Sequence, residues 1–352
     1  MYGKSLTDME TSLLSVQNLK IHFPVLGGVL KRQVGSVKAV DDVSFAIKPG
    51  ETLGLVGESG CGKSTLGKGI VRLYKPQSGN LVFQGRNISQ ASQWSIRPLR
   101  REMQMIFQDP SESLNARHSV RSILEEPYLI HGIGTKEDRR KWVNELLDRV
   151  GLPSSSADKY SFEFSGGQRQ RIGIARAIAL KPKLMICDEP VSALDVSVQS
   201  QVLNLMLELQ QEMGMAYLFI AHDLAVVKHI SDRVAVMYLG KIVELADADE
   251  IYRNPRHAYT KALLSAIPIA DPAARKNRIL LEGDVPSPIN PPRGSAFGHR
   301  IQHPLYPQTI DRDMPLTEVA PGHFVAADPC CLSEQDYAIC EQKMASTISV
   351  QK

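Results

Sequence analysis

The stretch Gly57-Glu58-Ser59-Gly60-Cys61-Gly62-Lys63-Ser64-Thr65 decides the fold of this chain of 352 residues. It matches the pattern G-x-x-x-x-G-K-S/T, which joins a strand to a helix and cradles a polyphosphate. An apolar run at residues 52–56 precedes it, and Leu66, Ile70 and Leu73 follow it at helical spacing. Glycines let successive backbone N–H groups face a ligand, and the helix adds the positive end of its dipole. We therefore expect a phosphate-binding loop.

Each polar side chain of this loop has an expected role. Lys63 would neutralise charge on the β- and γ-phosphates, and the Ser64 hydroxyl would ligate Mg²⁺, with Thr65 assisting nearby. All nine residues from 57 to 65 are thus candidate ATP-binding residues. The alternative is a Gly-rich turn without function, and the strand and helix on either side argue against it.

Short apolar strands and helical stretches alternate outward from this loop. We expect helices at residues 63–74, 139–150, 167–180, 198–213 and 224–230. We expect strands at residues 12–23, 37–47, 52–56, 81–83, 103–107, 183–187, 217–221 and 234–239. This order predicts an α/β fold with a largely parallel sheet. Residues 24–36 read as an exposed loop, and residues 110 to 180 hold no clear strand, which predicts a helical insertion.

The two ends of the chain differ in character from this central part. Residues 1–11 are polar and read as a loose leader. Prolines crowd the segment from 255 to 292, and helical periodicity fades after Ile267. We therefore predict a nucleotide-binding domain at residues 12–250, with a helical part at about 110–180, and a loop-rich C-terminal extension at residues 251–352.

The overall composition excludes several classes of protein. Hydrophobic residues make up 43% and charged residues 22%, which is typical of a folded globular chain. The net charge of +3 lacks the basic excess of a nucleic-acid binder. No apolar run approaches the ~20 residues of a membrane helix, and residues 1–11 are no secretory signal. Five cysteines without framework spacing fit a reducing compartment. We expect a cytoplasmic chain that another protein would hold at any membrane.

A second motif places two carboxylates after an apolar run, Leu184-Met185-Ile186-Cys187-Asp188-Glu189. Asp188 would hold Mg²⁺, and Glu189 would polarise a water that attacks the γ-phosphate. An apolar strand that ends in Asp-Glu is common and usually leads into a solvated loop. The motif therefore gains its weight from the phosphate loop upstream.

A third motif, Phe164-Ser165-Gly166-Gly167-Gln168, resembles the signature of the ATP-binding cassette family, with Phe164 in place of the usual leucine. Ser165 is expected to cap a helix, while Gly166 and Gly167 expose backbone N–H groups at its positive end. The resemblance implies that residues 165–168 close over the ATP held by a partner cassette.

Further motifs follow in the order that this family uses. Gln108 matches the Q-loop, Asp195 ends a match to the D-loop, and His222 matches the switch histidine. The resemblance covers residues 12–250. It implies a P-loop cassette fold that adds an antiparallel β part, with Glu189, His222 and Gln108 in catalysis and Gln108 also at the Mg²⁺. It also implies an aromatic ring on adenine, for which Phe23 is the candidate, although Phe23 fits the core equally well.

The segment Asn254-Pro255-Arg256-His257-Ala258-Tyr259-Thr260 resembles the start of the extension in oligopeptide/dipeptide permease ATPases. Residues 168–176 resemble the "F" member of the two ATPases that such permeases carry. The resemblance implies ATP-driven import of peptides, nickel complexes, glutathione or short sugars. It implies a second ATPase of the "D" type or a second copy, two transmembrane permease subunits and an extracytoplasmic solute-binding protein. The chain would lie peripherally on the cytoplasmic face of the inner (plasma) membrane.

The cysteines depart from the family pattern. Some relatives bind an iron–sulfur cluster in the extension, but Ser295 and Ala327 stand where two cysteines are expected. Cys330, Cys331 and Cys340 are three thiols at irregular spacing, which argues against a cluster with four thiolates. The expected cofactors are therefore ATP and Mg²⁺.

The sequence argues against two other functions. A soluble cassette that clamps nucleic acid or a ribosome would usually bring two cassettes in one chain, a coiled-coil insertion or zinc-binding cysteine pairs, and none is visible. An inactive regulatory subunit would have lost Glu189 or His222, and both are present.

Overall fold

The computed structural model describes residues 12–28, 31–109, 113–267, 279, 281 and 285–350. The predicted leader at residues 1–11 lies outside the described residues. The chain divides into two compact units. The first unit is drawn from Met1–Ile47, Leu53–Gln90 and His222–Lys352, and the second from Lys48–Thr52 and Ala91–Ala221. The phosphate loop therefore belongs to the first unit, and the signature and the carboxylate strand belong to the second.

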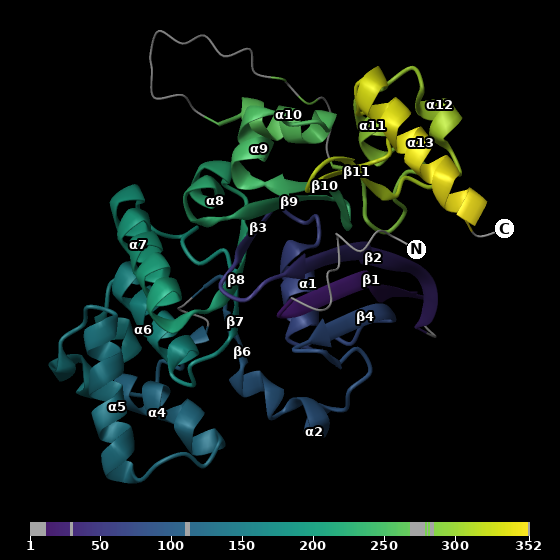
Figure 1. Ribbon diagram of the computed structural model, residues 1–352. Coiled ribbons are helices and arrows are strands. Elements are labelled where there is room, and N and C mark those ends of the chain that lie inside the picture. The colour runs from purple at the N-terminus through teal and green to yellow at the C-terminus, as the bar shows by residue number, and fades with distance from the viewer. Residues whose placement is uncertain are drawn as a thin grey trace, which may run out of the picture. The chain divides into compact units, whose positions relative to one another are not determined.

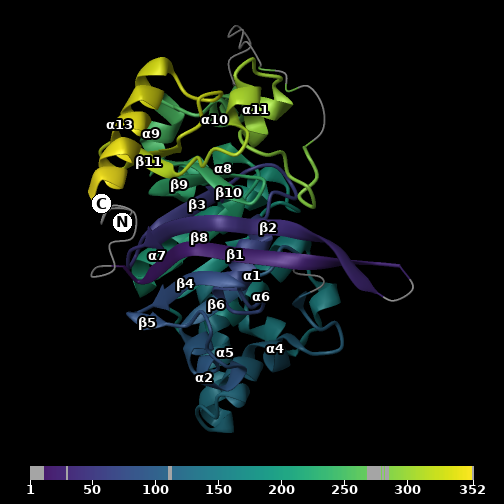
Figure 2. The same cartoon turned by 90° about the vertical axis from the view of Figure 1, so that its right-hand side faces the viewer.

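One sheet of the first unit is antiparallel, with the strand order β2-β1-β4-β5. Its strands β1 and β2 form a long ribbon (Figure 2). The prediction of an exposed loop at residues 24–36 was wrong, because Val25 pairs with Gly35 and Leu26 with Gln33. This pairing satisfies backbone groups whose side chains show no strand pattern. The strands are β1 (Leu14–Gly27), β2 (Arg32–Ile47), β4 (Ser78–Phe83) and β5 (Arg86–Asn87).

The second sheet of the first unit carries the strand that leads into the phosphate loop. Its order is β11-β12-β10-β9-β3, in which β3 and β9 are parallel and the other pairs antiparallel. All five residues of β3 are buried, as the apolar run predicts. The strands are β3 (Thr52–Val56), β9 (Arg233–Tyr238), β10 (Lys241–Asp247), β11 (Leu316–Ala320) and β12 (His323–Ala326).

The helix after the phosphate loop, α1 (Lys63–Ile70), is shorter than the predicted 63–74. Leu66 is buried, as its spacing predicts, but Leu73 is 49% exposed. The helix ends because Arg72 has a left-handed backbone (φ 58°) and its buried guanidinium donates to a backbone carbonyl oxygen at 3.0 Å. A tertiary contact thus overrides the helical periodicity of the sequence.

The C-terminal extension is more regular than the predicted loop-rich segment. Its strand β12 pairs with β10 and so extends the sheet that carries β3. Helix α13 begins after Ser333, whose hydroxyl accepts a hydrogen bond from the Asp336 N–H at 3.2 Å. The predicted boundary near residue 250 stays a prediction. The helices of the first unit after residue 222 are α8 (Leu224–Ile230), α9 (Ala248–Arg253), α10 (Ala258–Ser265), α11 (Ala296–Arg300), α12 (Tyr306–Thr309) and α13 (Glu334–Val350).

A buried carboxylate joins the extension to β10. Glu244 is fully buried and accepts hydrogen bonds from the backbone N–H groups of Arg256 at 2.7 Å and His257 at 3.0 Å. Its Oε1 also lies 2.7 Å from Nε2 of His323. Burial alone raises the pKa of Glu244, but the hydrogen bonds from His323 and the backbone favour the carboxylate, and the net pKa is lowered.

Replacing Glu244 with glutamine is expected to lower the free energy of unfolding at pH 7 by about 3 kcal/mol, because it removes a buried carboxylate that accepts hydrogen bonds from two backbone N–H groups. The folded pKa lies below the unfolded value of about 4.3, so this stabilisation is present above that pH and is lost as the pH falls through the folded pKa. Urea unfolding at pH 7 and below pH 4 measures the effect, and the free energies of unfolding of the variant and the wild type should converge in acid. A control, Glu145→Gln, removes an exposed ion pair and should cost below about 1 kcal/mol.

The second unit holds a parallel sheet of three strands and a group of helices. β7 pairs with β6 on one side and with β8 on the other. Among the described residues from 113 to 180 there is no strand, as predicted. Helices α4, α5 and α6 pack together, and α6 contacts α7 (Figure 1). The elements are α2 (Gln93–Ile96), β6 (Met103–Ile106), α4 (Val120–Ile130), α5 (Lys136–Arg149), α6 (Gly166–Ile178), β7 (Leu184–Asp188), α7 (Val196–Met213) and β8 (Ala216–Ala221).

Candidate nucleotide site

The phosphate loop needs its glycines for space as well as for backbone conformation. Gly57 and Gly62 have φ values of 155° and 109°. A Cβ on Gly57 would lie 2.1 Å from the carbonyl oxygen of Met237, and one on Gly62 would lie 1.9 Å from that of Ala39. The loop is therefore held against two backbone segments, from β9 and β2, that cannot move aside cheaply.

Gly62→Ala is expected to lower the free energy of unfolding by about 3 kcal/mol, since it adds both a clash with backbone and a strained φ. Gly60→Ala is the matched control. Gly60 has φ 79° but open space around its Cβ position, so only the strain of about 1 kcal/mol should remain. Chemical denaturation compares the two, and equal losses would contradict the packing argument.

Lys63 lies inside the loop rather than in solvent. Its side chain is buried, and Nζ donates to the carbonyl oxygens of Gly57 at 2.7 Å and Glu58 at 2.9 Å. Cys61 is buried 3.7 Å from the same Nζ. The ammonium group is thus held at the centre of the glycine turn, where a bound phosphate would meet it.

The rest of the loop lies ready for a ligand. Ser59 and Gly60 are exposed, and Ser64 and Thr65 are half-buried at the start of α1. Because α1 begins at Lys63, its positive end faces the loop. The strand–loop–helix arrangement predicted from the sequence is confirmed, while the role of each residue toward ATP stays a prediction.

In the second unit, the structure brings two predicted catalytic residues together. Nε2 of Gln108 donates to Oε2 of Glu189 at 3.1 Å. Asp188 ends β7 and is 2% exposed. Glu189 has a left-handed backbone (φ 46°), a strained conformation in a non-glycine residue that often marks a functional position. This unit therefore presents two carboxylates and an amide from adjacent parallel strands.

The signature motif forms the predicted helix cap. The Ser165 hydroxyl accepts from the Gln168 N–H at 3.3 Å, and the Gln168 side-chain oxygen accepts from the Ser165 N–H at 3.0 Å. Gly166, which is exposed, and Gly167, which is half-buried, form the first turn of α6. A Cβ on Gly167 would lie 2.4 Å from Val198, a contact that favours glycine here. An exposed, positively polarised helix end of this kind suits an anion.

The structure also describes three further predicted residues, His222, Asp195 and Phe23. His222 and Asp195 are exposed, and Asp195 precedes α7. Phe23 is half-buried and makes an edge contact with Tyr74, whose ring centroid is 5.1 Å away. Its role in stacking on adenine stays a prediction.

Two residues for which the sequence predicts no role at the ATP site, Tyr259 and Arg300, contact the phosphate loop. The Glu58 N–H donates to the hydroxyl of Tyr259, and Arg300 forms an ion pair with the Glu58 carboxylate. Both come from the extension, 201 and 242 positions further along the chain. No local pattern in the sequence signals pairs at such separations.

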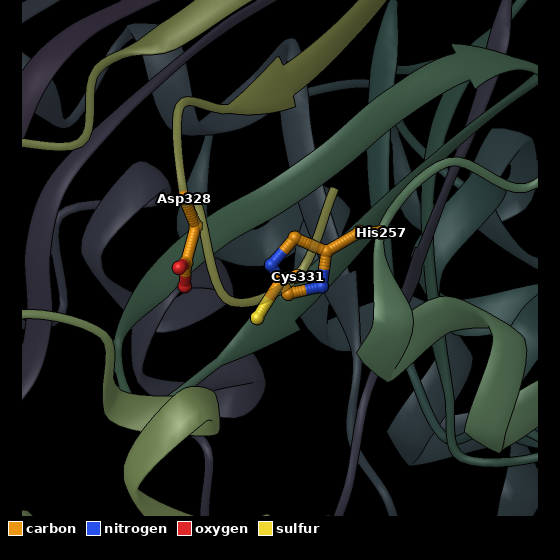
Figure 3. Close-up of side chains that lie close together, drawn as sticks. All are labelled: His257, Asp328 and Cys331. Atoms are coloured by element: carbon orange, nitrogen blue, oxygen red, sulfur yellow. The ribbon is translucent and has the colours of Figure 1, made fainter. Parts of the chain in front are cut away.

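A buried cluster in the extension combines His257, Asp328 and Cys331, whose ligand-type atoms lie within 4.8 Å of one another (Figure 3). Burial lowers the pKa of His257, which favours the neutral ring. Its Nδ1 accepts from the Tyr259 N–H at 3.1 Å, which leaves the proton on Nε2, the nitrogen that faces Asp328 and Cys331. A protonated nitrogen cannot ligate a metal, so the cluster reads as a hydrogen-bonded network.

The same cluster bears on the cysteine pattern. Ser295 donates to Asp328 at 2.5 Å, and the group of His257, Asp328 and Cys331 contains one thiol where an iron–sulfur cluster needs four. All five cysteines are free and buried. The absence of an iron–sulfur cluster stays a prediction.

Comparisons with known proteins define the class of this fold and site. A family model described as "ABC transporter" matches residues 40–192, and one described as "Oligopeptide/dipeptide transporter, C-terminal region" matches residues 243–303. The chain is similar to the solved ATP-binding cassette MJ0796 bound to ADP and Pi, with a TM-score of 0.60 and 26% identity over 67% of this chain and 98% of that one. The fold is that of an ATP-binding cassette, and the chain is an ATPase of this class.

Curated relatives identify the family. The chain is 53% identical to the oligopeptide transport ATP-binding protein AppF of Bacillus subtilis, over 90% of this chain and 97% of that protein. It is 51% identical to the putative oligopeptide transport ATP-binding protein YkfD of the same organism, over 89% and 94%. The chain therefore belongs to the ABC transporter family, as its motifs predict. Among the described residues, no helix is both long and apolar enough to cross a membrane.

Proposed function

We propose that this chain is the ATP-hydrolysing subunit that energises an ABC importer of peptides or related small solutes. The observation that carries the proposal is that a family model for ABC transporters and one for the C-terminal region of oligopeptide/dipeptide transporters both match this chain. Relatives named as oligopeptide transport ATP-binding proteins match about nine-tenths of the chain at more than half identity. The cargo itself would contact the solute-binding protein and the permease.

Each chain supplies half of two ATP sites. The loop at residues 57–65 binds the phosphates of one ATP, and residues 165–168 bind the γ-phosphate of an ATP held by the partner cassette. A nucleotide held between two chains joins them while its γ-phosphate is intact, and hydrolysis releases them. The exposed, capped start of α6 supports this role for the signature.

Glu189 is the group that positions and polarises the attacking water. The hydrogen bond from Gln108 orients its carboxylate, and His222 contacts the γ-phosphate. Asp195 lies in the D-loop near the partner. Phe23 supplies the ring that stacks on adenine.

Mg²⁺ is the expected metal because the donors offered are oxygen atoms. The Ser64 hydroxyl, the Asp188 carboxylate and the Gln108 amide oxygen match its preference for hard ligands. Bound there, the ion would neutralise charge that develops on the phosphates during hydrolysis.

The partners follow from the same family. They are a second ATPase, of the "D" type or a second copy of this chain, two transmembrane permease subunits and an extracytoplasmic solute-binding protein. The helical part of the second unit would dock on the permeases, so the chain would lie on the cytoplasmic face of the membrane. The rival function, a cassette that clamps nucleic acid or a ribosome, is not favoured, since the similar curated relatives are named as transport proteins.

Reconstitution separates these functions. The chain is combined with its partner ATPase and permeases in proteoliposomes, and peptide-loaded binding protein is added to the outside. ATP hydrolysis should rise several-fold and labelled peptide should accumulate in the lumen. Stimulation by RNA or ribosomes, with no response to the loaded binding protein, would overturn the proposal.

A further inference from the structure

The second residue of the phosphate loop is held by the C-terminal extension through an ion pair. Arg300 Nη1 lies 2.6 Å from Oε2 of Glu58, and Nη2 lies 3.1 Å from Oε1. The Arg300 side chain is 7% exposed and that of Glu58 is 27% exposed. A two-pronged, nearly buried pair of this kind fixes orientation as well as charge.

A backbone contact fixes the same residue from a second direction. The Glu58 N–H donates to Oη of Tyr259 at 2.9 Å. The Tyr259 ring is fully buried and packs on Tyr238 and Phe297, with centroids at 4.6 and 5.3 Å. The hydroxyl therefore sits on a rigid aromatic base, and the loop has little freedom at Glu58.

The helix that carries Arg300 is itself firmly placed. Helix α11 is capped by Ser295, whose hydroxyl accepts from the Gly298 N–H at 2.8 Å and donates to the buried Asp328. A Cβ on Gly298 would lie 2.6 Å from the Cβ of Cys330, so the helix packs tightly against the segment that contains Cys330. Arg300 thus approaches Glu58 from a fixed support.

The charge of Glu58 matters for the ligand. Its carbonyl oxygen is 2.9 Å from Nζ of Lys63, the group that is predicted to face the phosphates. A glutamate side chain is short, so its carboxylate lies closer to a polyphosphate bound in the loop than the Debye length of about 10 Å. Salt would therefore screen the repulsion between the two negative charges only weakly. Without Arg300, a negative charge would stand beside the site of a negative ligand.

From these contacts we propose that Arg300 and Tyr259 are positioning residues of the ATP site, through which the extension sets nucleotide affinity by fixing and neutralising Glu58. The inference deepens the proposed function by giving the extension a role in nucleotide binding. It does not depend on which solute is imported.

The test measures the affinity of Mg·ADP for the purified full-length chain by calorimetry, which needs neither permease nor turnover. Arg300→Met should weaken binding about tenfold, which corresponds to ~1.4 kcal/mol. Arg300→Lys keeps the charge but loses the two-pronged geometry, so it should lose less. Tyr259→Phe should weaken binding a few-fold, because the Glu58 N–H loses its acceptor.

The decisive variant is the double change Glu58→Gln with Arg300→Met. If Arg300 acts through the charge of Glu58, removing that charge as well should restore affinity to within about threefold of wild type, a non-additive result. In ATPase assays with the partner subunit, Arg300→Met should raise KM and leave kcat nearly unchanged. If Arg300 had only a structural role, Arg300→Met would lower thermal stability, the double variant would not regain affinity, and KM would not rise separately from kcat.

Arg293→Met is the matched control. Arg293 also lies in the extension, is 79% exposed and pairs with the exposed Asp311 at 3.8 Å. Its loss should leave affinity unchanged. An Arg300→Met chain that binds Mg·ADP within twofold of wild type, or a double variant no better than the single one, overturns the inference. If the variants change Mg·ADP affinity as expected but the reconstituted transporter imports no peptide, the result would instead count against the proposed function.

Discussion

Glu189→Gln is expected to reduce ATP turnover by a factor on the order of 10²–10⁴, because an amide cannot accept the proton of the attacking water. ATP binding should persist, since Glu189 lies outside the phosphate loop. The substitution keeps the size and planarity of the side chain beside Gln108, 3.1 Å away. With hydrolysis blocked, the ATP-bound pair of cassettes should accumulate.

Two measurements check this result. Phosphate release gives the turnover, and size-exclusion chromatography with Mg·ATP detects the trapped dimer. Glu208→Gln, an exposed change on α7 in the same unit, should leave both as in wild type. Turnover within tenfold of wild type in the Glu189 variant would show that another group activates the water.

Lys63→Ala should weaken nucleotide binding by about 10²-fold, equivalent to ~3 kcal/mol, because it removes charge-assisted hydrogen bonds to the phosphates. The buried ammonium also holds the carbonyl groups of Gly57 and Glu58, at 2.7 and 2.9 Å. The loop would therefore lose both its ligand contact and part of its internal order.

Calorimetric titration with Mg·ADP measures the effect directly. Lys68→Ala lies on the same helix, α1, and removes a lysine that takes no part in the loop. Its affinity should match that of wild type. If the Lys63 variant retained affinity within about fivefold, the assignment of the loop as the phosphate site would fail.

The sequence predicts the elements around the phosphate loop because their signals are local. The buried strand Thr52–Val56 and the capped start of α6 at Ser165 follow from residues a few positions apart. The same local logic fails for α1, where Arg72 ends the helix through a tertiary contact. It also fails for the paired strands around Val25, because apolar and polar side chains do not alternate there.

The parts of the site that sequence reasoning missed are set by long-range contacts. Arg300 and Glu58 are 242 positions apart, and neither belongs to a motif that names the other. Helix α13 was predictable in principle, because no proline or glycine follows Ser333. The crowding of prolines earlier in the extension hid that signal.

The pairing of β12 with β10 affects how a truncated form of this chain would behave. A fragment cut at residue 250 would strip a neighbour from β10 and leave Glu244 without His323. The bared strand would offer unpaired amides and carbonyls to any other copy in solution. We expect such a shortened cassette to aggregate, so the C-terminal extension is a structural part of the ATP-binding domain.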